Sequence, residues 1–193
     1  VGFFVLGTIC GVCHLLPFDI AETNISYYAL CALMFSVGLS VGNDPQTLKN
    51  FRSLNPRLVF LPIMTILGTL AGSAAVSLIL THRSITDCLA VGSGFGYYSL
   101  SSIFITEYKG AELGTIALLA NISREILTLL AAPLLVRWFG NLAPISAGGA
   151  TTMDTTLPII TRTAGQQFVV VSIFHGFVVD FSVPFLVTLF CSI

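Results

Sequence analysis

GSGFGYYSLSS, residues 92–102, and PISAGGATTMDTTLP, residues 144–158, are the two stretches that decide the fold of this chain. Both are rich in Gly, Ser, Thr or Pro, which weaken or break a regular helix. Apolar sequence surrounds each of them, and the first lies within an apolar segment at 87–106. The fold therefore has to place two interrupted segments among long apolar helices.

The sequence around these stretches is that of a membrane protein. Of 193 residues, 55% are hydrophobic and 9% are charged, and the mean hydropathy is +0.93. In a soluble domain about a quarter of the residues are charged. A helix needs ~20 mostly apolar residues to cross a bilayer, and five stretches reach or approach that length: 2–18, 25–42, 58–80, 115–138 and 167–191. We therefore predict an all-α polytopic membrane protein in which residues 1–193 form a single transmembrane domain.

Composition also excludes several classes of function. The net charge is −1 and the sequence has no basic run, so we expect no nucleic-acid partner. The sequence has no G-x-x-x-x-G-K-[ST] phosphate loop, which argues against ATP-driven transport. The five cysteines lie almost wholly in apolar stretches, where thiols pack as small hydrophobic groups. We expect neither a metal site nor a cofactor.

Lysine and arginine residues give the orientation, because they gather in the cytoplasmic loops of membrane proteins. The connection 43–57 contains Lys49, Arg52 and Arg57 and is assigned to the cytoplasm. If Arg137 and Arg162 are cytoplasmic as well, the first broken segment returns to the side that it left, and the second re-enters from the opposite side. We predict two re-entrant segments arranged as an inverted pair, from which transporters build binding sites. In the alternative, the glycines only allow close helix packing, or the first segment spans the membrane fully.

A polar stripe on the fourth apolar stretch contains the first candidate residues. Asn121, Glu125 and Thr128 recur at helical spacing, and Arg124 lies beside them. Charges inside a membrane are costly and by default mark a pathway or a relay. The functional interpretation is that Glu125 exchanges a proton or a cation. In the structural alternative, Arg124 or Asn121 pairs with a neighbouring helix.

Further candidates lie in the second broken segment and in the last apolar stretch. Asp154 and Thr155 occupy the expected turn of the broken segment, and a carboxylate among threonine oxygens suits a proton, an ammonium group or Na⁺. Alternatively, Asp154, Thr155 or Thr156 caps the short helix that follows. His175 and Asp180 lie five positions apart on the last stretch, and each is interpreted either as a functional group or as a packed hydrogen-bonding residue.

Four strings resemble a known family. They are AVGSGFGYYSLSSIFITE at 90–107, NISREI at 121–126, GGATTMDTTLPIITRTAG at 148–165 and HGF at 175–177. They resemble the LysO lysine exporters, which are bacterial inner-membrane proteins. The resemblance implies export of L-lysine and its toxic analogue thialysine, coupled to an inward cation flux that we take to be protons. It places Glu125 and Asp154 at the family's intramembrane acidic positions, whereas Asp180 lies outside the strings.

The resemblance also implies a partner. Members of the family resemble this chain only after a further N-terminal block of helices. Either those helices have been cut away from this sequence, or a second polypeptide supplies them. We therefore expect either a homo-oligomer or a separate polypeptide that supplies those helices.

The residues and the resemblance together predict an exchange mechanism. Burial disfavours the charged form of a carboxylate, so protons and an ammonium group compete for the same oxygens. We expect Asp154 and Glu125 to bind the ammonium groups of lysine and protons alternately. The α-carboxylate of lysine is expected at the helix ends of the first break, where the candidate groups are Ser93, Gly94, Gly96 and Arg124.

Three alternatives stay open. A Na⁺-coupled carrier for another small metabolite would use the same carboxylates. An intramembrane hydrolase would use Ser93 with His175, or a pair of acids, but the sequence has neither a rhomboid-like GxSG nor a GxGD motif. In the third alternative the chain is a structural subunit of a larger carrier.

Overall fold

The computed structural model describes residues 56–80 and 82–193, and the structural statements below concern these residues. Within them the chain forms seven α-helices and three short 3-10 helices, without a β-strand. The prediction of an all-helical protein is confirmed for this part of the chain. The predicted spans 2–18 and 25–42 lie outside it.

Three of the described helices are long and apolar enough to cross a membrane. They are α4 (Leu61–Ser77), which continues the 3-10 helix η1 (Pro56–Phe60), α7 (Ala111–Phe139) and α10 (Val169–Ser192). They agree with the predicted spans 58–80, 115–138 and 167–191. Many large apolar side chains on them are exposed, among them Leu67, Leu130 and Phe185. Exposed apolar surface of this extent suits lipid rather than water, as expected of a membrane protein.

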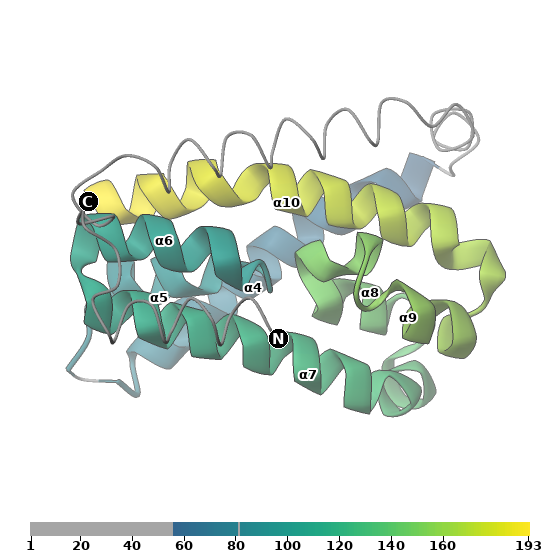
Figure 1. The fold of residues 1–193 in the computed structure, drawn as a ribbon. Coiled ribbons are helices and arrows are strands. Elements are labelled where there is room, and N and C mark those ends of the chain that lie inside the picture. The colour runs from purple at the N-terminus through teal and green to yellow at the C-terminus, as the bar shows by residue number, and fades with distance from the viewer. Residues whose placement is uncertain (1–55, 81) are drawn as a thin grey trace, which may run out of the picture. The chain divides into compact units, whose positions relative to one another are not determined.

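The first glycine-rich stretch separates two short helices that form a hairpin. In Figure 1, α5 (Ile85–Gly92) runs from one end of the bundle to its middle, and α6 (Tyr98–Lys109) returns to the same end, where α7 begins. Ser84 is the N-cap of α5, and its hydroxyl accepts a hydrogen bond from the backbone N–H of Asp87. We call residues 93–97, between the two helices, the first tip.

The second glycine-rich stretch forms another hairpin, from the opposite end. α8 (Ala143–Gly148) runs inward, and α9 (Leu157–Ala164) returns outward to the end where α10 begins, after the short helix η3 (Gln166–Phe168). The residues between α8 and α9, 149–156, start with the 3-10 helix η2 (Gly149–Met153). We call residues 149–156 the second tip. Both predicted interruptions are therefore real breaks between helices.

Apolar packing holds the hairpins against the long helices. Ile145 of α8, Ile160 of α9 and Val171 of α10 are buried in one cluster. The first hairpin packs through α6 along α7, and α10 contacts both hairpins. The two tips are thereby held within the bundle, where their backbone groups need partners inside the protein.

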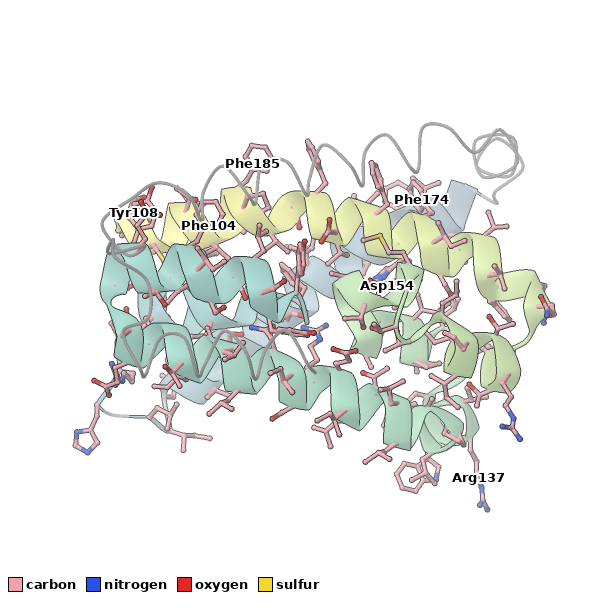
Figure 2. All side chains as sticks on the ribbon, in the orientation of Figure 1. Phe104, Tyr108, Arg137, Asp154, Phe174 and Phe185 are labelled. Atoms are coloured by element: carbon pink, nitrogen blue, oxygen red, sulfur yellow. The ribbon has the colours of Figure 1, made fainter. Side chains whose placement is uncertain are left out.

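Charged side chains gather at the two ends of the bundle. At the end where α7 begins, Asp87 pairs with Lys109 at 3.9 Å, and Arg83 pairs with Glu112. The basic residues of the other end are Arg137, in the last turn of α7, and Arg162, in the last turn of α9. Figure 2 labels Tyr108 near the first end and Arg137 at the second. The bundle therefore has two polar ends and a largely apolar exterior between them.

The two tips touch in the middle of the bundle. The backbone N–H of Ala150 donates to the carbonyl oxygen of Phe95 at 2.9 Å. Gly149 has a φ of 63°, and a Cβ added there would lie 2.2 Å from that carbonyl oxygen. Glycine is therefore required at this contact. Gly149 thus allows a close approach between the two broken segments, whereas Gly92 allows α5 to pack closely on Ser73 of α4.

Candidate functional site

Asn121, on the buried face of α7, holds the first tip. Its Oδ1 accepts a hydrogen bond from the backbone N–H of Gly96 at 2.8 Å. Its Nδ2 donates to the carbonyl oxygens of Ala117 at 2.9 Å and Val91 at 3.2 Å. The side chain is 3% exposed. Asn121 therefore gives the N–H of Gly96, in the break between α5 and α6, a partner within the protein.

The predicted carboxylate-binding groups of the first tip already have partners within the protein. The Ser93 hydroxyl donates to the carbonyl oxygen of Leu89 at 2.7 Å. A Cβ on Gly94 would lie 2.4 Å from Nδ2 of Asn121, so glycine allows the asparagine to reach the tip. The N–H of Gly96 is bound by the same side chain. Binding of a substrate carboxylate at Ser93, Gly94 and Gly96 stays a prediction.

Arg124, one turn further along α7, holds the second hairpin. Its Nε donates to the carbonyl oxygen of Ala147 at 2.8 Å, and its Nη2 donates to that of Ser146 at 3.1 Å. These carbonyls belong to the last turn of α8, where backbone acceptors lack helical partners and the helix dipole favours a cation. The guanidinium carbon also lies 5.8 Å from the ring centre of Phe95. Arg124 therefore contacts both hairpins.

A cavity leads from Arg124 to one end of the bundle. Its volume is about 710 Å³, and it lies between α4, α5 and α7. Arg83 and Asp87 line it at the end of the bundle, and Asn121 and Arg124 line it in the middle. Nη1 of Arg124 reaches Thr69 of α4 at 3.4 Å. Within the described ranges, no carboxylate forms an ion pair with Arg124.

Glu125 is half-buried on α7 between the buried residues Asn121 and Thr128. The spacing places these three residues along one face of the helix, as the sequence predicted. Its carboxylate forms no hydrogen bond or ion pair with any residue that the structure describes. Arg124 and Glu125 are therefore not an internal ion pair, because the arginine binds the carbonyls of α8 instead.

Asp154 and Thr155 lie on the second tip and are exposed. Figure 2 labels Asp154 between the end marked by Tyr108 and the end marked by Arg137, nearer to Arg137 in this view. One carboxylate oxygen of Asp154 accepts from the backbone N–H and from the hydroxyl of Thr155. Thr156, and not Asp154, is the N-cap residue of α9, and its side chain makes no capping bond. Asp154 therefore does not cap α9, and this structural alternative is wrong.

His175 is a fully buried hydrogen-bonding residue that joins three elements. On α10 it is 0% exposed. Its Nε2 lies 3.0 Å from the hydroxyl of Thr65 on α4, and its Nδ1 lies 3.3 Å from the hydroxyl of Thr152 on η2. Thr152 in turn donates to the carbonyl oxygen of Ser172 at 2.9 Å. His175 thus helps to hold the second tip against α4 and α10.

The serine version of the hydrolase alternative lacks its required contact. A nucleophilic serine needs a base within hydrogen-bond reach. Ser93 donates to the carbonyl oxygen of Leu89, whereas both nitrogens of His175 face threonine hydroxyls. The two residues therefore do not form a nucleophile and base pair.

Sequence reasoning missed the groups that assemble the site around the candidates. Thr65 lies 110 positions from His175, and no local sequence pattern predicts their contact. Phe95 joins the tips through its carbonyl, although its side chain reads as ordinary apolar sequence. Asp180 was detectable as a charge in an apolar stretch, and the structure buries it on α10 to 6% exposure.

A family model described as Lysine exporter LysO matches residues 1–191 of the chain. The chain belongs to this family. Lysine exporter LysO of Escherichia coli (strain K12) is 36% identical over 191 residues, which are 99% of this chain and 62% of that protein. A Haemophilus influenzae protein named "Putative lysine exporter" is 36% identical over 165 residues, 86% of this chain and 83% of that protein. No solved structure matches the chain.

Membership in the LysO family confirms the resemblance that the four sequence strings carried. The family is one of transporters rather than enzymes, and the chain is a multi-pass membrane protein homologous to a bacterial exporter. The chain spans 62% of the length of the LysO protein from E. coli. The activity named for that relative therefore belongs to a longer protein.

Proposed function

We propose that the chain forms the transport core of an exporter of L-lysine and thialysine in a bacterial inner membrane, working by exchange with protons. The observation that carries this proposal is the contact between two hairpin tips in the middle of the bundle. Arg124 contacts both hairpins there, and Asp154 lies on the second tip. An amino acid needs both a cationic and an anionic partner at such a site.

The hairpins are re-entrant and form an inverted pair. One enters from the end that holds Arg83 and Lys109, and the other enters from the end that holds Arg137 and Arg162. The positive-inside rule assigns the second end to the cytoplasm, because Lys49, Arg52 and Arg57 directly precede the start of α4. Leu58 and Leu61, at that start, pack against Ile145 and Ile160 of the second hairpin. Broken segments from opposite sides are the usual setting of a transporter's substrate site.

Lysine is recognised through its three charged groups. Asp154 and Glu125 bind the ammonium groups, because both carboxylates have oxygens without a partner among the described residues. Arg124 binds the α-carboxylate, because its guanidinium uses only part of its five N–H donors on α8 and Thr69. Thr155 and His175 keep Asp154 and the second tip in position.

Coupling to protons follows from competition at the carboxylates. A carboxylate away from bulk water is costly when it is charged and unpaired. Either a proton or an ammonium group relieves that cost, and the two cannot occupy the same oxygen together. Release of lysine on one side and uptake of protons on the other therefore gives exchange.

The exporter contains more than this chain. The E. coli relative is longer, since the match covers 62% of it. Helices that correspond to the rest of that relative complete the pathway, whether they belong to the same polypeptide, to a second copy of the chain or to a separate polypeptide. Thus the transport site is complete only in that assembly.

Lysine efflux from proteoliposomes that contain the complete assembly tests this proposal. Wild-type protein is expected to release loaded lysine faster when an inward proton gradient is imposed. Asp154→Asn and Glu125→Gln remove one charge each at almost constant volume, and each is expected to slow efflux about tenfold or more, the scale of one lost charge-assisted hydrogen bond. The matched control is Glu112→Gln, at an exposed residue at the end of the bundle, which should keep wild-type efflux. Wild-type efflux from either variant removes that carboxylate from the mechanism.

A sodium-coupled carrier is the second candidate. It is favoured by the threonine oxygens around Asp154, where the Thr155 hydroxyl contacts the carboxylate and the Thr151 and Thr156 hydroxyls lie 3.3 Å apart. Unwound backbone and polar oxygens at such breaks also suit Na⁺. An inward sodium gradient at fixed pH distinguishes the two, because only the sodium carrier accelerates efflux under that gradient.

A further inference from the structure

Asp180 is a buried carboxylate to which the exchange mechanism gives no task. It lies on α10 and is 6% exposed. Its carboxylate forms no hydrogen bond or ion pair in the part of the chain that the structure describes. A charged group in the membrane interior is costly unless it is paired. Among the described residues nothing therefore offsets the cost of burying this carboxylate, and a bound cation would do so.

The second tip brings Asp154 to the same stretch of α10. Gly176 lies one turn before Asp180, on the buried face of α10. A Cβ on Gly176 would lie 2.7 Å from the backbone nitrogen of Met153, so the missing side chain lets the tip lie directly on the helix. Asp154 is the next residue along the tip. The glycine thus places the two aspartates on neighbouring backbone segments.

The two carboxylates are electrostatic neighbours. The charge of Asp154 acts on the carboxyl group of Asp180. Both also act on the phenol of Tyr97, the last residue of the first tip. Tyr97 ends the first tip, which contacts the second tip through Phe95 and Ala150, so the three residues belong to backbone segments that meet in the middle of the bundle. Arg124 does not neutralise this region as an ion-pair partner, because it binds the carbonyls of α8.

Two neighbouring carboxylates in an apolar setting repel each other when both are charged. A monovalent cation between them relieves that repulsion and supplies the ionic partner that neither carboxylate has among the described residues. The phenol of Tyr97 offers either a hydrogen-bond acceptor or a face for a cation. An organic ammonium group fits these requirements, since it donates several hydrogen bonds at once.

We propose that Asp180, together with Asp154, binds the side-chain ammonium group of the exported substrate, with Tyr97 beside it. This inference rests on the proposed function, because it takes lysine as the substrate. It divides the binding site in two. The ammonium end of lysine lies at α10 and the second tip, and the α-carboxylate end lies at Arg124.

The test compares two ligands that differ mainly in charge. Lysine and norleucine share a linear side chain and the amino acid head group, but norleucine lacks the side-chain ammonium. The affinity of the purified, complete assembly for each is measured by equilibrium binding of the labelled amino acid. The wild type is expected to prefer lysine strongly. In Asp180→Asn that preference should fall about tenfold or more, the scale of one charge-assisted hydrogen bond, mainly through weaker binding of lysine.

Control variants separate charge recognition from folding. Asp180→Glu keeps the charge and should keep most of the preference, and Glu112→Gln should leave it unchanged. A structural role for Asp180 would weaken the binding of both ligands alike. If the preference for lysine survives in a folded Asp180→Asn protein, the inference is overturned while the proposed function stands. If the wild type itself does not prefer lysine, the proposed function fails.

A measurement on the wild type covers the case in which Asp180→Asn does not fold. Dicyclohexylcarbodiimide is an apolar reagent that labels protonated carboxyl groups within membranes, and mass spectrometry locates the label. Asp180 is expected to be labelled, and lysine should protect it whereas norleucine should not. Absence of labelling at Asp180, or labelling that lysine does not reduce, contradicts the inference.

Discussion

Neighbouring residues on α7 have different tasks, although the sequence presents them as one polar stripe. Asn121 is occupied by the backbone of the first tip, and Arg124 by the carbonyls of α8. Glu125, beside them, binds nothing in the described ranges. Asn121 and Arg124, whose side chains are hydrogen-bonded to the backbone, position the two hairpins. Glu125, whose carboxylate has no such partner, can bind a ligand.

Replacing Asn121 with alanine tests its structural task. The substitution leaves the N–H of Gly96 without its partner and removes one of the donors to the carbonyl of Val91. A buried unsatisfied group costs about 1–3 kcal/mol. We expect a clear fall in the melting temperature of the detergent-solubilised protein, measured by size-exclusion chromatography after heating. Asn141→Ala, at an exposed residue beyond the end of α7, is the matched control and should melt like the wild type. Equal melting of the two variants would show that Asn121 does not hold the tip.

At the scale of elements, hydropathy and helix-breaking residues were enough to predict the three described spans and the two breaks. A spanning helix needs a minimum length of apolar sequence, and a cluster of Gly, Thr and Pro residues interrupts a helix. Such patterns could not predict the contacts of the tips, because these contacts join positions that are far apart in the sequence. Phe95 meets Ala150, and Thr65 meets His175, through backbone or hydroxyl groups that many residues could supply. The candidate residues were therefore predictable as a set, but not their division into positioning groups and groups without partners.

The contact between the tips can be tested with two glycines that share a backbone conformation. Gly149 and Gly140 have φ angles of 63° and 87°, so alanine is strained at both. Only at Gly149 would the new Cβ meet another tip, 2.2 Å from the carbonyl oxygen of Phe95; at Gly140 nothing lies within 4 Å. Overpacking adds about 1–3 kcal/mol, so Gly149→Ala should melt at a lower temperature than Gly140→Ala in the same heating assay. Identical melting would mean that the tips do not need their close contact.

At the scale of the whole molecule, the ion pairs at one end of the bundle determine which connections lie on the same side of a bilayer. The hairpin of α5 and α6 enters from the end where α7 begins, and the hairpin of α8 and α9 enters from the end where α10 begins (Figure 1). The ion pairs of Asp87 with Lys109 and of Arg83 with Glu112 join the start of α5, the end of α6 and the start of α7. The connection before α5 and the one after α6 must therefore face the same side of the membrane. A fully spanning first segment would separate them.

Cysteine labelling from each side of the membrane tests this arrangement. His82 precedes α5 and Ala111 begins α7, and both are exposed at the end that holds the ion pairs. In a background without the five native cysteines, His82→Cys and Ala111→Cys should react with a membrane-impermeant maleimide from the same, periplasmic side. Asn141→Cys, at the opposite end, should react only from the cytoplasmic side, where the positive-inside rule places Arg137. Labelling of His82→Cys and Ala111→Cys from opposite sides would mean that the first segment crosses the membrane. The inverted pair of hairpins, and the binding site that it supports, would then have to be abandoned.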